Sequence, residues 1–222
     1  MIIEIENLEP KKEIIDQVVQ ILKKGGLIVY PTETAYGLGC DAFNIKAIEK
    51  IYEIKSRPLD NPLPVIVDSI TMIEQIAFMQ DNAKILIEKY YPGPLVIALK
   101  KKDIIPDILN KDGIAFRISS NELIKNIVEK FGKPIVSTSA NQTGAKPPYT
   151  ITDVLETIDE KDVDIILDAG VLEQNKPSTI VDFVMPNSPQ IMREGAITAK
   201  EILQTLNIEE EKWEQHLKYQ KK

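Results

Sequence analysis

Three arginines are the residues of this sequence whose type and placement point most directly to chemistry. The chain has 27 basic residues, and all the others are lysines. Arg57 lies in Lys-Ser-Arg-Pro, Arg117 in Ala-Phe-Arg-Ile-Ser-Ser and Arg193 in Met-Arg-Glu-Gly, each beside glycine, proline or hydroxyl residues. A guanidinium binds phosphate or carboxylate through paired hydrogen bonds, which an ammonium cannot do. The pattern indicates anion binding at these positions; the alternative for any one of them is an ordinary ion pair.

Segments rich in hydroxyl, amide and glycine residues follow expected strands, where α/β folds place their ligands. Residues 30–39 are Tyr-Pro-Thr-Glu-Thr-Ala-Tyr-Gly-Leu-Gly, and residues 135–144 are Ile-Val-Ser-Thr-Ser-Ala-Asn-Gln-Thr-Gly. The first supplies neutral donors and acceptors suited to an amino acid or a sugar. The second could cradle phosphate oxygens through its hydroxyls and backbone N–H groups. The alternative for each segment, and for residues 177–182 and 193–195, is ordinary turn chemistry.

Residues 55–63, Lys-Ser-Arg-Pro-Leu-Asp-Asn-Pro-Leu, place two cations at the expected end of a helix, followed by a proline-stiffened loop. Cations are favourable at a helix C-terminus because of the helix dipole. Two cations on a loop that is already ordered would equally make a phosphate clamp. The composition of the segment does not separate the two interpretations.

Several other chemistries are disfavoured by the residues that the chain lacks. Cys40 is the only cysteine, which excludes an internal disulfide and fits a reducing compartment. We expect it to be a small, semi-buried residue, because no histidine is near it in sequence. The only histidine, His216, lies in a charged tail, which argues against Ser-His-Asp, Cys-His and zinc sites. Neither a P-loop nor a Gly-x-Gly-x-x-Gly fingerprint occurs.

Charge and hydropathy limit the partners. The net charge of −7 argues against a surface coated in basic residues for broad nucleic-acid binding, but not against a local basic pocket. No run of 18 apolar residues occurs, so we expect no membrane span. Residues 1–6 alternate in polarity and lack a basic region, which is typical of a strand rather than a signal peptide. We therefore expect a cytoplasmic protein.

Apolar periodicity switches repeatedly between helix and strand patterns, with no composition break, linker or repeat. This predicts a single α/β domain over residues 1–207, a twisted mixed β-sheet with helices packed on it. Residues 208–222 are predicted to be a charged C-terminal extension, in which Trp213 and Leu217 either dock on the domain or a partner, or belong to a solvated tail. The expected helices are 10–24, 44–54, one from 69, 81–90, 121–131, 152–158 and 198–206. The expected strands are 1–6, 27–30, 64–67, 95–99, 114–118, 134–136, 164–167, 179–184 and 190–193.

Seven motifs in order resemble the YrdC/YciO family, and the resemblance covers residues 14–198. They are Tyr-Pro-Thr-Glu-Thr at 30–34, Lys-x-Arg-Pro at 55–58, Asp-Asn-Pro-Leu at 60–63, Tyr-Pro-Gly-Pro at 91–94, Ser-Ala-Asn at 139–141, Ser-Thr-Ile-Val-Asp at 178–182 and Arg-x-Gly at 193–195. Within the family the chain is most similar to the short, single-domain threonylcarbamoyl-AMP synthases. The resemblance implies a YrdC-like domain around a concave cavity.

The resemblance also implies a reaction. L-threonine, bicarbonate and ATP would give threonylcarbamoyl-adenylate and pyrophosphate, and the product would serve threonylcarbamoylation of adenosine 37 in tRNA. A tRNA or a tRNA-modifying transferase complex is then a possible partner. Mg²⁺ is expected to accompany ATP through its phosphates, because no dense carboxylate cluster suggests a protein metal site.

The residues implied by the resemblance fall into three groups. The active-cavity pairs, expected to be catalytic, are Lys55, Arg57, Ser139 and Asn141. ATP would be held by Arg57, Asn61, Ser139 and Arg193. L-threonine would be held by Thr34, Arg117, Ser137 and Ser178, with Arg117 pairing with its carboxylate.

The chain departs from the family's usual residues at four positions. Ile66 stands where many members have histidine, Gly113 where threonine is frequent, Pro147 where serine is frequent, and Pro177 where glutamate is common. These departures place individual contacts in question. The alternatives to a synthase are an RNA-binding or ribosome-maturation factor, a family paralogue with another reaction, and a structural partner subunit.

Overall fold

The computed structural model describes residues 1–5, 11–185 and 189–217 of the chain. Within those residues it contains seven α-helices. They are α1 (Lys12–Lys23), α2 (Ile45–Ile54), α3 (Ile70–Ile76), α4 (Asp81–Tyr90), α5 (Glu122–Phe131), α6 (Ile151–Leu155) and α7 (Ala199–Thr205). The strands are β1 (Ile2–Glu4), β2 (Ile28–Pro31), β3 (Tyr36–Gly39), β4 (Val65–Ile66), β5 (Leu95–Lys100), β6 (Gly113–Arg117), β7 (Ile135–Val136), β8 (Thr138–Ser139), β9 (Ile165–Asp168), β10 (Thr179–Asp182) and β11 (Gln190–Arg193).

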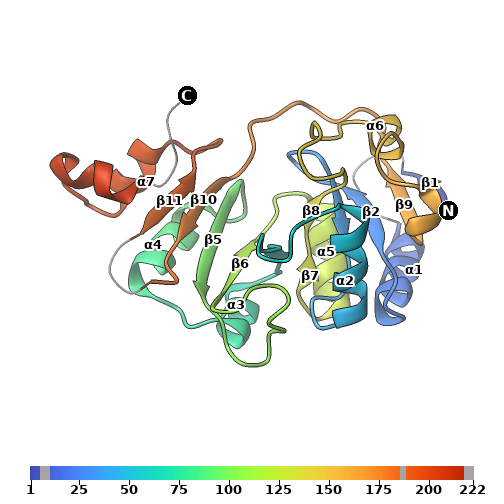
Figure 1. Cartoon of the computed structure of the whole chain (residues 1–222), viewed down its shortest axis with the longest axis horizontal. Helices are drawn as coiled ribbons and strands as arrows, with labels where there is room; N and C mark the ends of the chain where they lie inside the picture. The colour runs from blue at the N-terminus through green and yellow to red at the C-terminus, as the bar shows by residue number, and fades with distance from the viewer. Residues whose placement is uncertain (6–10, 186–188, 218–222) are drawn as a thin grey trace.

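The strands form two mixed sheets, which confirms the predicted α/β class and divides the expected sheet into two (Figure 1). The first has the order β1-β9-β2-β3-β8, and the second has the order β11-β10-β5-β6-β4-β7. The chain passes from the second sheet to the first at Ser137, because β7 ends before it and β8 begins after it. A single residue therefore stands at the point where the two sheets meet.

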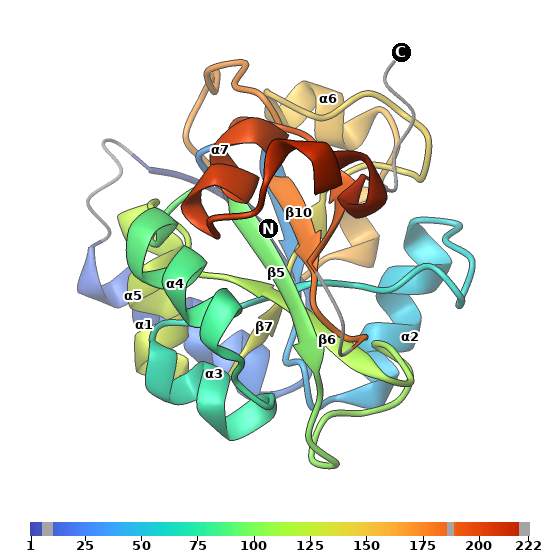
Figure 2. The ribbon, with the colours of Figure 1, turned by 90° about the vertical axis from the view of Figure 1, so that its left-hand side faces the viewer.

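Helices bury the outer faces of both sheets. In α1, Val18 and Leu22 are fully buried, as the period of a helix with one apolar face requires, and α1 packs against α5. Each such side chain contributes about 2 kcal/mol of burial free energy. The second sheet carries α3, α4 and α7 on the face turned toward the viewer in Figure 2, with α4 against α7.

Side-chain caps and a positive-φ glycine set the helix boundaries. The Asn121 side chain accepts from the N–H groups of Leu123 and Ile124, and Gly132 ends α5 at φ 73°. The short helices α6 and α7 each begin with a capping box, from Thr150 and Thr198 respectively. These local signals explain why most predicted helices agree with the observed ones to within a few residues.

Residues 30–39 were expected to follow a strand as a ligand-binding or turn segment, and this expectation is wrong in part because the segment contains a strand of its own. Residues 30–39 form a hairpin in which β2 and β3 pair antiparallel, Tyr30 opposite Gly37, with Thr32–Ala35 as its turn. All four residues of β3 are buried. Two glycines weaken the strand signal of this sequence, and burial between neighbouring strands overrides it.

The C-terminal residues 208–217 pack on the domain. A 3₁₀ segment, Glu210–His216, leads to Leu217, which bridges to Ile191 of β11 and packs partly buried against the core. The His216 ring is buried, with Nδ1 2.9 Å from the Pro189 carbonyl oxygen. Of the two alternatives for the tail, docking is correct for Leu217. The side chain of Trp213 and residues 218–222 lie outside the described residues, and the domain boundary at 207 stays a prediction.

Candidate active site

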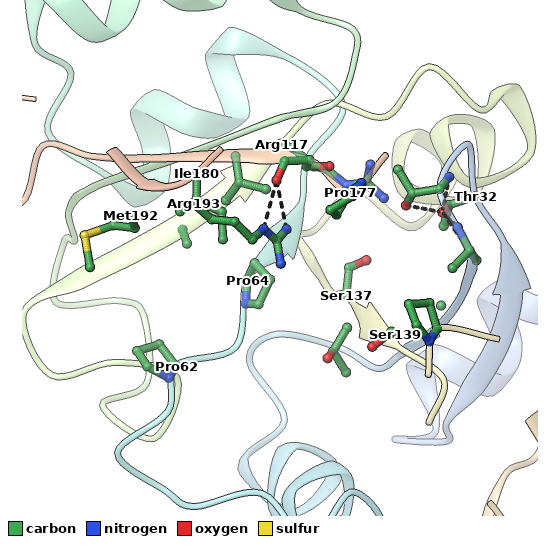
Figure 3. A pocket seen from close by; sticks show the side chains of 18 of the residues that line it. Thr32, Pro62, Pro64, Arg117, Ser137, Ser139, Pro177, Ile180, Met192 and Arg193 are labelled. Carbon is green, nitrogen blue, oxygen red and sulfur yellow. Dashed lines mark hydrogen bonds between the residues drawn. The ribbon is translucent and has the colours of Figure 1, made fainter. Parts of the chain in front are cut away.

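A cavity of about 550 Å³ is lined by residues of both sheets and of the loops between them (Figure 3). Alternate residues of β10, β5 and β6 face it, among them Val96, Ala98, Ala115 and Ile180. These side chains are apolar, so part of the cavity wall is apolar. Hydroxyl groups and guanidinium groups stand around this part of the wall.

All eight residues predicted to bind ATP or L-threonine line this one cavity. They are Thr34, Arg57, Asn61, Arg117, Ser137, Ser139, Ser178 and Arg193. They come from six segments spread over 160 positions of the chain, from residue 34 to residue 193. The three arginines therefore share a hollow, as their scarcity in the sequence predicted. Which ligand each residue holds stays a prediction.

Lys55 and Asn141 do not line the cavity and lie beneath its wall. Lys55 is 1% exposed, and its ammonium donates to the carbonyl oxygens of Ser139 and Asn141, both at 2.6 Å. Burial, together with the nearby positive charge of Arg57, lowers the pKa of Lys55 to about 7. Because Lys55 has no access to the cavity, the structure gives it a positioning role for the turn that carries Ser139.

Asn141 completes this turn. Its Oδ1 accepts from the Ser139 hydroxyl at 2.6 Å, and its Nδ2 donates to the carbonyl oxygens of Ala145 and Lys146, both at 2.8 Å. The predicted Lys-x-Arg and Ser-x-Asn pairs thus divide into two layers. Arg57 and Ser139 face the cavity, and Lys55 and Asn141 hold Ser139 from behind.

Arg57 is held by its own loop. Its Nε donates to the Asn61 carbonyl oxygen at 2.9 Å, and its Nη2 donates to Asn61 Oδ1 at 2.8 Å and to the Pro62 carbonyl oxygen at 2.7 Å. Nη1 makes none of these three bonds. The loop therefore fixes the guanidinium plane before a ligand arrives, which supports the phosphate-clamp interpretation of this segment.

Arg193 is held in the same way by a carbonyl group. Its Nε and Nη2 both donate to the Ser178 carbonyl oxygen, at 3.1 and 2.9 Å, as the dashed lines in Figure 3 show. The close approach depends on Gly195, where a Cβ atom would overlap the Pro177 carbonyl oxygen. The Arg-x-Gly motif and the strand that begins at Thr179 are thus packed directly together.

Arg117 differs from the other two arginines because it has an acidic partner. Its Nη1 donates to Glu33 Oε1, and the Ser119 hydroxyl donates to Glu33 Oε2 at 2.6 Å. Sequence reasoning assigned Arg117 to a substrate carboxylate and missed Glu33. The signal was available, since Glu33 lies between two threonines of the same motif.

These partners give the cavity an uneven charge. Within the described part of the chain, Arg57 and Arg193 donate to carbonyl oxygens and form no ion pair with a carboxylate. Both cations are therefore available to a polyanion, whereas the charge of Arg117 is balanced by Glu33. A protein with a net charge of −7 thus concentrates positive charge at one cavity.

Cys40 and the four positions that depart from the family's usual residues lie in different surroundings. Cys40 is fully buried, and burial raises the pKa of its thiol far above the ordinary value, so it is no nucleophile. Pro147 and Pro177 line the cavity, whereas Ile66 and Gly113 do not. A Cβ atom at Gly113 would lie 2.5 Å from Val184 Cγ2, which leaves no room for a threonine there.

The sequence and the fold both match known proteins. The Sua5/YciO/YrdC family model, described by the words telomere recombination, matches residues 20–195. A threonylcarbamoyl-AMP synthase of Photobacterium profundum is 36% identical over 186 residues, which cover 82% of this chain and 98% of that protein. The chain belongs to the Sua5/YciO/YrdC family.

Two solved structures of Sua5/YciO/YrdC proteins resemble this fold. Pyrococcus abyssi Sua5, complexed with L-threonine, superposes with a TM-score of 0.86 at 29% identity over 92% of this chain. The chain spans 60% of the length of that protein. Escherichia coli YciO superposes with a TM-score of 0.80 at 30% identity, over 91% of this chain and 98% of YciO. The family thus includes a protein solved with an amino acid and another described as uncharacterized.

Proposed function

We propose that this chain is a threonylcarbamoyl-AMP synthase, which converts L-threonine, bicarbonate and ATP into threonylcarbamoyl-adenylate and pyrophosphate. The observation that carries the proposal is one cavity with two kinds of anion site. Arg57 and Arg193 form no ion pair with a carboxylate of the described residues, and Arg117 offers a charge already paired with Glu33. A triphosphate fits Arg57 and Arg193, and a zwitterion of no net charge fits Arg117 with its partner Glu33.

The ATP end consists of Arg57, Asn61, Ser139 and Arg193. Two guanidiniums can neutralise the phosphates and the charge that develops as pyrophosphate leaves. Since the loop 55–63 and the Ser178 carbonyl already fix both groups, little ordering entropy is lost when ATP binds. The apolar side chains of the cavity wall, Val96, Ala98, Ala115 and Ile180, can contact a nucleobase.

The L-threonine end consists of Thr34, Arg117, Ser137 and Ser178. Arg117 binds the amino-acid carboxylate through its remaining N–H donors. The hydroxyls of Thr34, Ser137 and Ser178 supply neutral hydrogen bonds to the rest of a small polar molecule. Pyrococcus abyssi Sua5, whose structure contains L-threonine, supports this assignment through its similar fold.

The chemistry needs position more than it needs a protein nucleophile. The threonine amine, once it has lost a proton, attacks bicarbonate or the carbon dioxide derived from it. With bicarbonate, the N–C bond forms and a bicarbonate oxygen leaves as water, taking a proton from the nitrogen. With carbon dioxide, the N–C bond forms as one C–O π bond opens, and the nitrogen loses a proton to solvent. Either route gives the carbamate. A carbamate oxygen then attacks the α-phosphorus, the bond from that phosphorus to the bridging oxygen breaks, and pyrophosphate leaves. The protein holds the two reactants in line and stabilises the charge on the leaving phosphates.

Mg²⁺ enters this scheme as part of the substrate, bound to ATP phosphates and water. Among the residues that the structure describes, no group of three or more His, Cys, Asp or Glu side chains could hold a metal ion. Asp182 does line the cavity, but a single carboxylate does not make a Mg²⁺ cage. The donors present thus fit a metal that arrives with the nucleotide.

We propose that a transferase complex uses the product to modify adenosine 37 of tRNA, which accepts the threonylcarbamoyl group. A cytoplasmic location fits that role and a chain with one cysteine. Over the described ranges, no helix is long and apolar enough to cross a membrane.

Mass spectrometry of reaction mixtures tests the proposal. The protein is incubated with Mg²⁺, ATP, bicarbonate and L-threonine, and each substrate is omitted in turn. Threonylcarbamoyl-adenylate and pyrophosphate should form only in the complete mixture. Pyrophosphate release that does not need L-threonine would contradict the assignment.

Two alternatives remain distinguishable. Escherichia coli YciO, which is called uncharacterized, is 32% identical to this chain over 199 residues, so a paralogue with another reaction is the closer alternative. In that case ATP would be consumed with a different co-substrate. If the chain were an RNA-binding factor, it would hold tRNA in a filter-binding assay whether or not ATP is present. The negative net charge disfavours that alternative.

A further inference from the structure

Tyr30, which sequence reasoning used only as part of a motif, lies behind the proposed threonine end. It is fully buried on β2, and its hydroxyl donates to Ser137 Oγ at 2.7 Å. Ser137 lines the cavity at the point where the two sheets meet. Figure 3 shows the Ser137 side chain among the cavity-lining side chains, with Ser139 to one side.

The neighbouring strand leaves room for the Tyr30 ring. A Cβ atom at Gly37 would lie 3.0 Å from Tyr30 Cζ, and one at Gly39 would lie 3.0 Å from Tyr30 Cε1. The Cβ at Gly39 would also lie 2.5 Å from the Val136 carbonyl oxygen. Two glycines of β3 thus allow the ring to cross the strand and reach Ser137, at some cost in strand stability.

The direction of this hydrogen bond follows from burial. Within the described residues, Ser137 Oγ is the acceptor found for the Tyr30 hydroxyl. A buried hydroxyl proton without an acceptor costs about 1–3 kcal/mol, so the proton goes to Ser137. Burial raises the pKa of Tyr30 to about 12, so it stays a donor at all physiological pH values. Ser137 therefore accepts a hydrogen bond from Tyr30 and does not donate one to it.

We propose that Tyr30 is a positioning residue that holds Ser137 as a hydrogen-bond donor toward the carboxylate of the bound amino acid. A serine hydroxyl can normally rotate to donate or accept. Here one oxygen lone pair is occupied from behind, so the hydroxyl has its proton free to donate into the cavity. Arg117 lines the same cavity and has only donors, so the two groups together favour an anionic group.

This inference rests on the proposed function, because it assigns one contact within the threonine end. It adds the group that Ser137 meets and the residue that fixes it. It also explains why the Tyr-Pro-Thr-Glu-Thr motif and the Gly-x-Gly of β3 occur together: the ring and the space for the ring come from paired strands.

Steady-state kinetics of Tyr30→Phe tests the inference, since phenylalanine keeps the ring and removes the donor. The KM for L-threonine should rise about fivefold to tenfold, as for a weakened hydrogen bond to a charged group, with the KM for ATP unchanged. Ser137→Ala should raise the KM for L-threonine at least as much. The double variant should be no worse than Ser137→Ala, because Tyr30 acts through Ser137. Tyr90→Phe is the matched control, because the Tyr90 hydroxyl forms its hydrogen bond with Thr205, away from the cavity.

The outcomes are separable. If the wild-type protein makes no threonylcarbamoyl-adenylate, the proposed function fails. If it does, but Tyr30→Phe changes neither KM, or changes both KM values equally, the role of Tyr30 is wrong. Additive effects in the double variant would also overturn it. Should Tyr30→Phe lower the thermal midpoint strongly, calorimetric titration of folded Ser137→Ala with L-threonine replaces it, and unchanged affinity there refutes the contact.

Discussion

Lys55 offers the sharpest test of the site's construction, through the pH dependence of folding. Its ammonium is buried among carbonyl oxygens, and burial lowers its pKa from 10.5 to about 7. Between those two values the unfolded chain binds a proton that the folded chain does not. Stability then rises with pH, by about 1.4 kcal/mol for each pH unit. From pH 7 to pH 9 the free energy of unfolding should gain up to about 3 kcal/mol from this group.

The carbonyl groups that accept from Lys55 reduce the expected gain in stability. Ser139 and Asn141 each accept from the ammonium at 2.6 Å, which favours the charged form and makes the gain smaller than this upper value. Below pH 7 both states carry the proton, and the contribution becomes constant. The effect therefore extends from about pH 7 to about pH 10.5, and its part up to pH 9 can be measured below the range in which tyrosines titrate.

Urea unfolding of the wild type and of Lys55→Met at half-unit steps of pH measures this contribution. Methionine has a similar length and no ionisable group, so the difference between the two curves isolates Lys55. The wild type should gain stability relative to Lys55→Met as pH rises. Lys84→Met, which removes an exposed lysine of α4, controls for general charge effects. If the free energy of unfolding changed with pH in the same way for the wild type and Lys55→Met, the claim that the buried Lys55 loses its proton in this range would be refuted.

Three further predictions concern other positions. Arg57→Ala should lower threonine-dependent pyrophosphate release by about 100-fold or more with the circular dichroism spectrum unchanged, while Lys46→Ala, on the helix α2 that precedes the Arg57 loop, should keep activity; near-normal release from Arg57→Ala would contradict the ATP clamp. Gly195→Ala should destabilise the protein by about 2 kcal/mol or more in urea, because its Cβ would overlap the Pro177 carbonyl oxygen; an unchanged midpoint would mean that this contact relaxes. Cys40 should resist iodoacetamide in the folded protein and react after unfolding, because burial raises its pKa; rapid labelling of the native chain would show that the thiol is accessible.

Local patterns predicted most of the helices. The apolar period of residues 10–24 matches α1, and the asparagine caps at 44 and 121 begin α2 and α5 as expected. Such signals depend on neighbours within a few positions, so a sequence displays them openly. The strand β3 was missed because two of its four residues are glycines, which the Tyr30 ring requires and which strand propensity disfavours.

Site residues were predicted by type, and their partners were not. The scarcity of arginine pointed to three positions, and all three line one cavity. The motif contained Glu33, but its spacing could not show that Glu33 balances Arg117 while carbonyl groups hold Arg57 and Arg193. An ion pair that joins residues 84 positions apart depends on how strands pair, and strand pairing depends on long-range packing.

The sequence by itself determined the fold class, the family and the set of side chains available for anion binding, because periodicity and motif spacing are local properties. Tertiary structure alone decided which of those side chains reach the cavity and which support it from behind. Lys55 and Arg57 are two residues apart, yet Lys55 is buried behind the cavity wall and Arg57 lines the cavity. The reason is that burial depends on what packs above a residue, and here the covering segment, residues 139–141, comes from the opposite half of the chain.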